Sequence, residues 1–155
     1  PCPCGYFGHA SIACRCTPDM VARYQDRISG PLLDRIDMRV EVNSLPDEAI
    51  VALPDGEPTR FVAERVRKAY DRAIARQGRL NDQLQGAGLE EACSIDEPVQ
   101  KLLHAASVRL GWSARAYHRV LKVARTIADL ADAEGIASQH VAEAIQYRRS
   151  LRDTG

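Results

Sequence analysis

The chain has 155 residues with 21 basic and 21 acidic side chains, so its formal net charge at neutral pH is zero. That balance excludes a polycation that would bind nucleic acid through overall charge alone. A hydrophobic content of 45% suffices for one good core or two small ones. No apolar run approaches the roughly 20 residues of a membrane-spanning helix, and no leader peptide opens the chain. We therefore expect a soluble, cytoplasmic protein without a membrane partner.

A segment rich in cysteine, glycine and proline opens the chain. It is too irregular to pack without a cross-link such as a bound metal ion or a disulfide. It holds two closely spaced pairs, Cys2 with Cys4 and Cys14 with Cys16. Four thiolates in a loop with little core favour a tetrahedral structural Zn²⁺ that pins the loop, although Cys-x-x-Cys is the more usual spacing. His9 could replace one sulfur. Two disulfides or a redox-active thiol pair are the alternatives.

Residues 18–43 predict a helix, a short second helical turn and a strand. Thr17 followed by proline has the pattern of a helix cap with a first-turn proline, and apolar residues recur behind it at helical spacing. Leu32 and Leu33 anchor the second turn after a Ser-Gly-Pro break. From residue 36 to residue 43 apolar and polar side chains alternate, which is typical of a half-buried strand.

The rest of the chain predicts a linker and then an all-α domain. Residues 44–58 hold three prolines, one glycine and four acids, which is typical of a linker or exposed loop. Apolar side chains then recur at helical spacing in four segments, with a further short helical turn near residues 80–84 in a glycine-punctuated connection. Short connections between them predict a four-helix bundle. The four segments are residues 59–77, 98–110, 113–133 and 138–147.

Two of these helices are rich in basic residues. Between Arg60 and Arg79, seven basic side chains accompany only Glu64 and Asp71. Five more lie between residues 109 and 125, with no acid among them. These helices could bind phosphates or acidic neighbours, or they could be ordinary solvated helix faces.

The chain lacks the loop that most nucleotide-hydrolysing enzymes use to hold a triphosphate. Such a P-loop needs a glycine-rich turn followed by Gly-Lys and a hydroxyl residue. The three lysines are Lys68, Lys101 and Lys122, and none follows a glycine. Asp96 and Glu97 read better as the start of a helix than as the acidic pair of a Walker B strand.

Four stretches of sequence carry a specific resemblance that covers nearly the whole chain. They are Cys2-Pro-Cys-Gly-Tyr6, Cys14-Arg-Cys16, Arg27-Ile-Ser-Gly-Pro-Leu-Leu-Asp-Arg-Ile-Asp37 and Ser113-Ala-Arg-Ala-Tyr-His-Arg-Val-Leu-Lys-Val-Ala-Arg-Thr-Ile-Ala-Asp-Leu130. Together they resemble the C-terminal part of magnesium-chelatase-like AAA+ ATPases of the YifB/ComM type. Both Walker motifs and the initiator Met are missing, so we expect this chain to be the second part of a larger machine.

The resemblance implies a mainly α fold in three parts. Residues 1–43 would be the end of a AAA+ α/β core, contributing a short helix and one strand, residues 44–58 a linker, and residues 59–155 a helical lid of the magnesium-chelatase C-terminal type. Arg35 would be the arginine finger offered in trans to a neighbouring subunit. Arg115 would be the sensor-2 arginine of the lid, with Arg119 one turn further as the substitute. The alternative for Arg35 is a helix-end arginine paired with Asp34 or Asp37.

The resemblance also implies cofactors and partners for the full-length protein. These are ATP with Mg²⁺, identical subunits in a ring expected to be a hexamer, and DNA, as in a DNA-handling motor. The chain alone is expected to be inactive, because it lacks the P-loop. The competing interpretation is a nucleic-acid or protein-binding module built from a zinc knuckle and basic helices.

Overall fold

The computed structural model describes residues 2–9, 12–40, 42 and 56–148. The chain divides into two compact units, Pro1–Ile36 with Val40–Gly56 and Asp37–Arg39 with Glu57–Gly155. The described elements are helical, which confirms the mainly α prediction, and none of these helices is long and apolar enough to cross a membrane.

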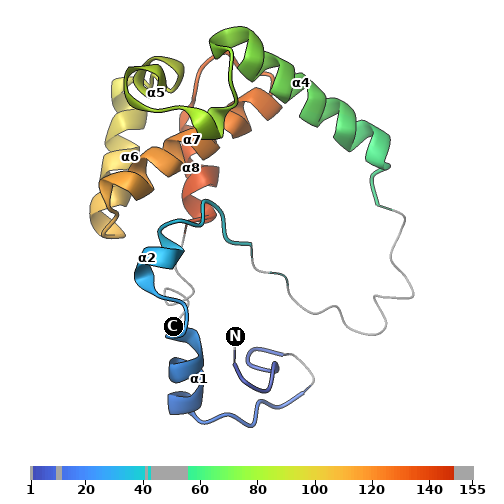
Figure 1. Ribbon diagram of the computed structural model, residues 1–155, viewed down its shortest axis with the longest axis vertical. Coiled ribbons are helices and arrows are strands. Elements are labelled where there is room, and N and C mark those ends of the chain that lie inside the picture. Colours follow the sequence, from blue (N-terminus) through green and yellow to red (C-terminus); the bar gives the residue numbers. More distant parts are fainter. Residues whose placement is uncertain (1, 10–11, 41, 43–55, 149–155) are drawn as a thin grey trace. The chain divides into compact units, whose positions relative to one another are not determined.

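The described residues of the first unit form two short helices (Figure 1). Helix α1, Pro18–Gln25, begins where predicted, because the side chain of Thr17 accepts a hydrogen bond from the backbone N–H of Met20 at 3.3 Å. Helix α2, Gly30–Leu33, is capped in the same way by Ser29. Among the described residues of this unit only Cys2 and Val21 are buried. The described part of this unit therefore has almost no apolar core, as the cysteine-rich sequence indicated.

The predicted strand over residues 36–43 is not confirmed. Residues 36–40 and 42 have no strand geometry, and the remaining residues of the prediction lie outside the described part of the chain. A strand needs a neighbouring strand to complete its hydrogen bonds, and the described residues contain none. Instead, the backbone N–H of Arg39 donates to the carbonyl oxygen of Tyr147 at 2.8 Å. The predicted linker likewise lies almost wholly outside the described residues.

The second unit is a bundle of helices centred on α7 (Figure 1). Helix α7 packs against α8, α4 and the 3₁₀ turn η1, and α6 packs against α8. Each of the four predicted helices is present within three residues of its expected ends, and η1 lies in the predicted short turn. The elements in chain order are α4 (Thr59–Gln77), η1 (Asn81–Gln83), α5 (Gly86–Ala92), α6 (Glu97–Arg109), α7 (Ala114–Leu130) and α8 (Ser138–Gln146).

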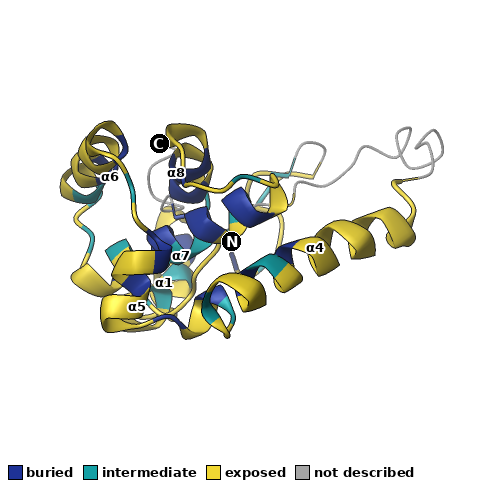
Figure 2. Cartoon of the chain, turned by 90° about the horizontal axis from the view of Figure 1, so that it is seen from above, coloured by how far each residue is buried: buried dark blue, intermediate teal, exposed yellow. Residues whose placement is uncertain are grey.

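The core of the second unit lies where α5, α6, α7 and α8 face one another (Figure 2). Its largest fully buried side chains are Val99, Leu103, Val120 and Val141. Burying each of them contributes about 1.5–3 kcal/mol relative to exposure. The N-caps Asp96 and Ser113 begin α6 and α7 as the sequence predicts. This packing buries one face of α7 and leaves another face exposed.

Helix α4 has the predicted bounds but not the predicted burial. Only Ala69 and Ala73 are buried, whereas Phe61, Val66 and Tyr70 are 47%, 55% and 48% exposed. The first half of α4 extends beyond the rest of the bundle (Figure 2). The apolar stripe has the expected period, but among the described residues only the second half of the helix buries side chains of that stripe.

Two boundaries differ from the sequence prediction because single residues take unexpected conformations. Helix α5 begins at Gly86, at a φ of 51°, and contains Gly88, although two glycines indicated a loose connection. Burial of Leu89 and Ala92 against the core stabilises this short helix. Helix α7 ends at Leu130 because Asp132 adopts a left-handed φ of 59°, so the chain turns before the predicted stop at Gly135.

Candidate functional site

The four N-terminal cysteines converge in the first unit. The Sγ atom of Cys2 lies 3.4 Å from that of Cys4 and 3.7 Å from that of Cys14, and the Sγ atoms of Cys4 and Cys14 are 3.6 Å apart. Cys16 completes the group, with all four sulfurs within 4.8 Å of one another. Ligands of a tetrahedral zinc with Zn–S bonds of about 2.3 Å lie about 3.8 Å apart. The cluster therefore has the dimensions of a zinc site, and its sulfurs are too far apart for disulfides.

The close approach of the thiols shifts their pKa values in opposite directions. Backbone N–H groups of Tyr6 and Arg15 hydrogen-bond Cys4 and lower its pKa to about 6. A hydrogen bond from the backbone N–H of Cys4 lowers the pKa of Cys16. Desolvation and the adjacent thiols outweigh that hydrogen bond and raise the pKa of Cys16 to about 12. Four thiolates this close repel one another unless a divalent cation compensates their charge. His9 lies outside the sulfur cluster, where its Nδ1 accepts from the backbone N–H of Ile12 at 3.1 Å.

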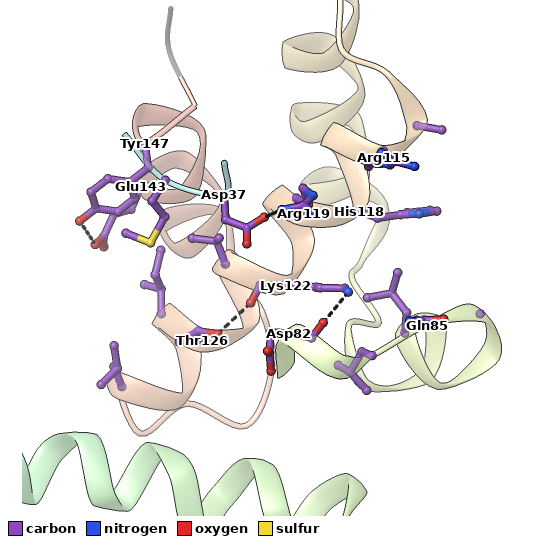
Figure 3. A pocket seen from close by; sticks show the side chains of 18 residues that line it. Asp37, Asp82, Gln85, Arg115, His118, Arg119, Lys122, Thr126, Glu143 and Tyr147 are labelled. Atoms are coloured by element: carbon purple, nitrogen blue, oxygen red, sulfur yellow. Dashed lines mark hydrogen bonds and ion pairs between the residues drawn. The ribbon is translucent and has the colours of Figure 1, made fainter. Parts of the chain in front are cut away.

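The second unit contains a pocket of about 870 Å³ along one side of α7 (Figure 3). Arg115, His118, Arg119 and Lys122 occupy successive turns of the helix and line one wall. Apolar side chains also line the pocket, from Leu84 directly after η1, from Leu89 of α5 and from the second half of α7. The further lining residues are Asp37, Met38, Asp82, Leu84, Gln85, Gly86, Leu89, Ala114, Val123, Thr126, Ile127, Leu130, Glu143 and Tyr147.

The pocket combines positive charge with the beginning of a helix. Ser113 caps α7, its Oγ accepting from the N–H of Ala116 at 3.2 Å, so the positive end of the helix dipole lies in the same region as Arg115. Arg115 and His118 are exposed, while Arg119 and Lys122 are half-buried. Together these groups form a wall suited to an anion with several negative charges.

Two cations of this wall are held by other parts of the chain. Arg119 forms an ion pair with Asp37, and Lys122 donates to the backbone oxygen of Asp82 at 2.8 Å (Figure 3). For Arg115, the part of the chain that the structure describes offers neither a hydrogen bond nor an ion pair. The two predicted sensor-2 arginines thus lie on one wall. They differ in that Arg119 has an ion pair with Asp37, whereas Arg115 has no ion pair among the described residues.

The predicted arginine finger lies in the first unit. Arg35 is exposed and follows α2, with its backbone N–H donating to the carbonyl of Leu32 at 3.0 Å. Arg115 and Arg119 belong to the second unit, so the structure describes the finger and the sensor-2 arginines separately.

A buried polar network was missed by sequence reasoning. Arg76 of α4 donates to both carboxylate oxygens of Asp129, at 2.6 and 2.9 Å, and Arg125 lies 3.0 Å from the same carboxylate. Asn81 also donates to Asp129, at 2.8 Å. Burial raises the pKa of Asp129, but these hydrogen bonds and charges outweigh it and hold that pKa below its ordinary value. The sequence carried one signal for this network: Arg125 and Asp129 are four positions apart, the spacing of an ion pair within a helix, and they flank the buried Ala128.

Most cations of α4 are neutralised within the chain. Within the basic segment the sequence offers only Glu64 and Asp71 as acidic partners, but acids outside that segment also form ion pairs with α4. The ion pairs are Arg65 with Glu57, Arg67 with Asp71, Lys68 with Glu64, Arg72 with Asp132 and Arg76 with Asp129. In the second predicted basic helix, Arg125 is buried with Asp129. Less charge is therefore available for phosphates than the sequence predicted.

Comparisons with known proteins match two segments of the chain to one family. Residues 1–50 match the family described as magnesium chelatase, subunit ChlI, and residues 56–148 match the C-terminal part of the same subunit. The chain therefore belongs to the magnesium chelatase ChlI family.

Within that family the chain is similar to YifB and ComM. It is 40% identical over 151 residues to YifB of Salmonella typhimurium and 39% identical over 153 residues to competence protein ComM of Haemophilus influenzae. A protein of Mycobacterium tuberculosis is 34% identical over 154 residues. These alignments cover 96–98% of this chain but only 29–30% of the relatives. The chain thus spans less than a third of the length of these relatives.

Proposed function

We propose that this chain is the C-terminal portion of a cytoplasmic AAA+ ATPase that hydrolyses ATP with Mg²⁺ in a ring of identical subunits. The observation that carries the proposal is the cationic wall of the α7 pocket, where Arg115, Arg119 and Lys122 follow one another along the helix. Guanidinium and ammonium groups beside a helix N-terminus suit the phosphates of a nucleotide. Family membership supports the same function.

Arg115 is the sensor-2 residue of this proposal. It lies in the first turn of α7, is exposed at the pocket, and has no ion pair among the described residues. A γ-phosphate would engage its guanidinium, and hydrolysis would remove that contact and allow the lid to move. Arg119, one turn along the same face, is the second nucleotide-binding arginine.

Arg35 is the proposed arginine finger. It is exposed at the end of α2, which suits a side chain that acts on a neighbouring subunit. Its positive charge would compensate the charge that develops on the transferred phosphoryl group. The proposed assembly is a hexamer in which each finger serves the adjacent site.

The cysteine cluster would hold one structural zinc. The sulfur separations support this ligand set of Cys2, Cys4, Cys14 and Cys16. The described residues around the cluster bury few apolar side chains, so such a cross-link would supply much of their order. Zinc would therefore fix the loop that precedes α1 and take no part in hydrolysis.

DNA is the proposed substrate of the motor. Support comes from the similarity to a relative named for competence. The alternative, a nucleic-acid or protein-binding module made of a zinc knuckle and basic helices, is less favoured because five cations of α4 are paired with acids of the same chain. That alternative would leave Arg35 and Arg115 without a shared task.

Single variants of the full-length protein test the proposal. Arg35→Ala should leave ATP binding largely intact and reduce turnover by about 10³-fold or more, the scale on which arginine fingers act. Arg115→Ala should reduce both binding and turnover. Reduced binding with normal turnover per bound ATP in the Arg35 variant would contradict the finger role. The 155-residue chain alone should show no ATPase activity, and robust hydrolysis by it would contradict the assignment as a dependent portion.

A further inference from the structure

An acidic side chain of this protein lies on the cationic wall of the α7 pocket. Asp37 forms an ion pair with Arg119 across 82 positions of sequence, and Asp37 itself lines the pocket. The side chains of Asp37 and Arg119 are 50% and 27% exposed, so both remain accessible to solvent and to a ligand (Figure 3). The carboxylate thus lies where a phosphate that approached Arg119 would have to bind.

The position of Asp37 is set by a backbone contact two residues further on. The N–H of Arg39 donates to the carbonyl of Tyr147 at the end of α8, at 2.8 Å. Tyr147 in turn donates from its hydroxyl to Glu143 at 3.1 Å, within α8 and its cap. Residues 37–39 are therefore held along the rim of the pocket.

The three cations of the wall differ in what the chain offers them. Among the described residues Arg115 has no ion pair, and Lys122 is bound to a neutral backbone oxygen of Asp82. Arg119 contacts a carboxylate. Carboxylate and phosphate both bind the guanidinium group through charge-assisted hydrogen bonds, so they compete for the same donors.

We propose that Asp37 is an internal competitor for the phosphate-binding wall: it occupies Arg119 in the ligand-free chain, and a polyphosphate must displace it to bind. This inference rests on the proposed nucleotide site. A partly exposed ion pair is weak enough to exchange with a ligand that carries several charges. The carboxylate therefore lowers the affinity of the wall for phosphates. Displacing it costs the same free energy for every ligand, so the cost is a larger share of the binding free energy of a ligand with fewer charges.

The opposite role would be that of a positioning residue. If Asp37 oriented Arg119 toward a phosphate, its removal would weaken binding. The two roles differ in sign, which makes the neutral variant Asp37→Asn decisive. Asp71→Asn is a matched control, because Asp71 also forms an Arg–Asp ion pair on the surface of the same unit but does not line the pocket.

Isothermal titration of the 155-residue chain with inorganic tripolyphosphate at low salt tests the proposal. Asp37→Asn should bind about two- to fivefold more tightly than the wild type, the range expected from an exposed ion pair. Asp71→Asn should show only the small general effect of losing one negative charge. Arg119→Gln should weaken binding, and adding Asp37→Asn to Arg119→Gln should change the affinity by no more than Asp71→Asn changes that of the wild type. Circular dichroism should confirm an unchanged helical content in each variant.

The variants separate failure of this proposal from failure of the nucleotide site. If Arg115→Gln and Arg119→Gln weaken binding but Asp37→Asn binds no more tightly than Asp71→Asn, the competitor role is overturned and the site stands. If neither arginine variant weakens binding, or if neither the wild type nor Asp37→Asn binds saturably, the site is overturned and the competitor role with it.

Discussion

The carboxylate of Asp129 receives both hydrogen bonds of the Arg76 guanidinium, at 2.6 and 2.9 Å, and so joins α7 to α4. Arg125 and Asn81 complete the network, which places a second guanidinium and the turn η1 against the same carboxylate. The side chain of Asp129 is 1% exposed and that of Arg125 is 3% exposed. The helix that carries the pocket wall is therefore fixed by buried charges further along its length.

Neutralising Asp129 should destabilise the second unit strongly. Asp129→Asn keeps the shape of the side chain but leaves the buried Arg125 without a counter-charge, and removing one partner of a buried pair costs about 3–5 kcal/mol. Chemical denaturation followed by circular dichroism measures this loss. Asp71→Asn removes an exposed pair and should cost less than about 1 kcal/mol. Equal losses for the two variants would contradict a structural role for the network.

The same network predicts how stability depends on pH. The pKa of Asp129 is held below its ordinary value in the folded chain, so the folded state binds this proton less readily than the unfolded state. The stabilisation is therefore complete above the unfolded pKa of about 4 and is lost as pH falls through the folded pKa. The stability difference between wild type and Asp129→Asn should shrink below about pH 4. A difference that stayed constant down to pH 2 would contradict the shift.

Metal analysis should find one zinc per chain in protein purified without added zinc or chelator. The four clustered thiols should then be protected from a thiol reagent, and Cys93 should be unreactive as well, because burial raises its pKa to about 11. Chelation should expose the four clustered thiols and leave the helical content of the second unit unchanged. No metal together with freely reactive N-terminal thiols would contradict the zinc site.

Local sequence signals predicted the helical unit well. Asp96 and Ser113 accept the hydrogen bonds expected of N-caps, and Gly78 ends α4 in the left-handed conformation. These features depend on a few neighbouring residues, so sequence alone specifies them. Convergence of the four cysteines was also predictable, because two close pairs separated by a glycine-containing loop can meet without help from the rest of the fold.

Features that depend on distant neighbours were not predictable in the same way. Residues 36–43 alternate like a strand, but a strand forms only beside another strand. The apolar stripe of α4 has the correct period, yet Phe61 and Val66 lie beyond the last packed turn. The pairing of Asp37 with Arg119 and of Arg76 with Asp129 joins residues more than 50 positions apart, and spacing carries no signal for such contacts.

Subunit mixing tests most directly whether Arg35 acts in trans and Arg115 in cis within one ATPase ring. Full-length Arg35→Ala and Arg115→Ala subunits should each be nearly inactive alone. In randomly mixed rings, an intact Arg115 site meets an intact Arg35 finger at about a quarter of the interfaces, so ATPase activity should rise toward that fraction of wild type. Activity that never exceeds the sum of the two separate variants would contradict the account.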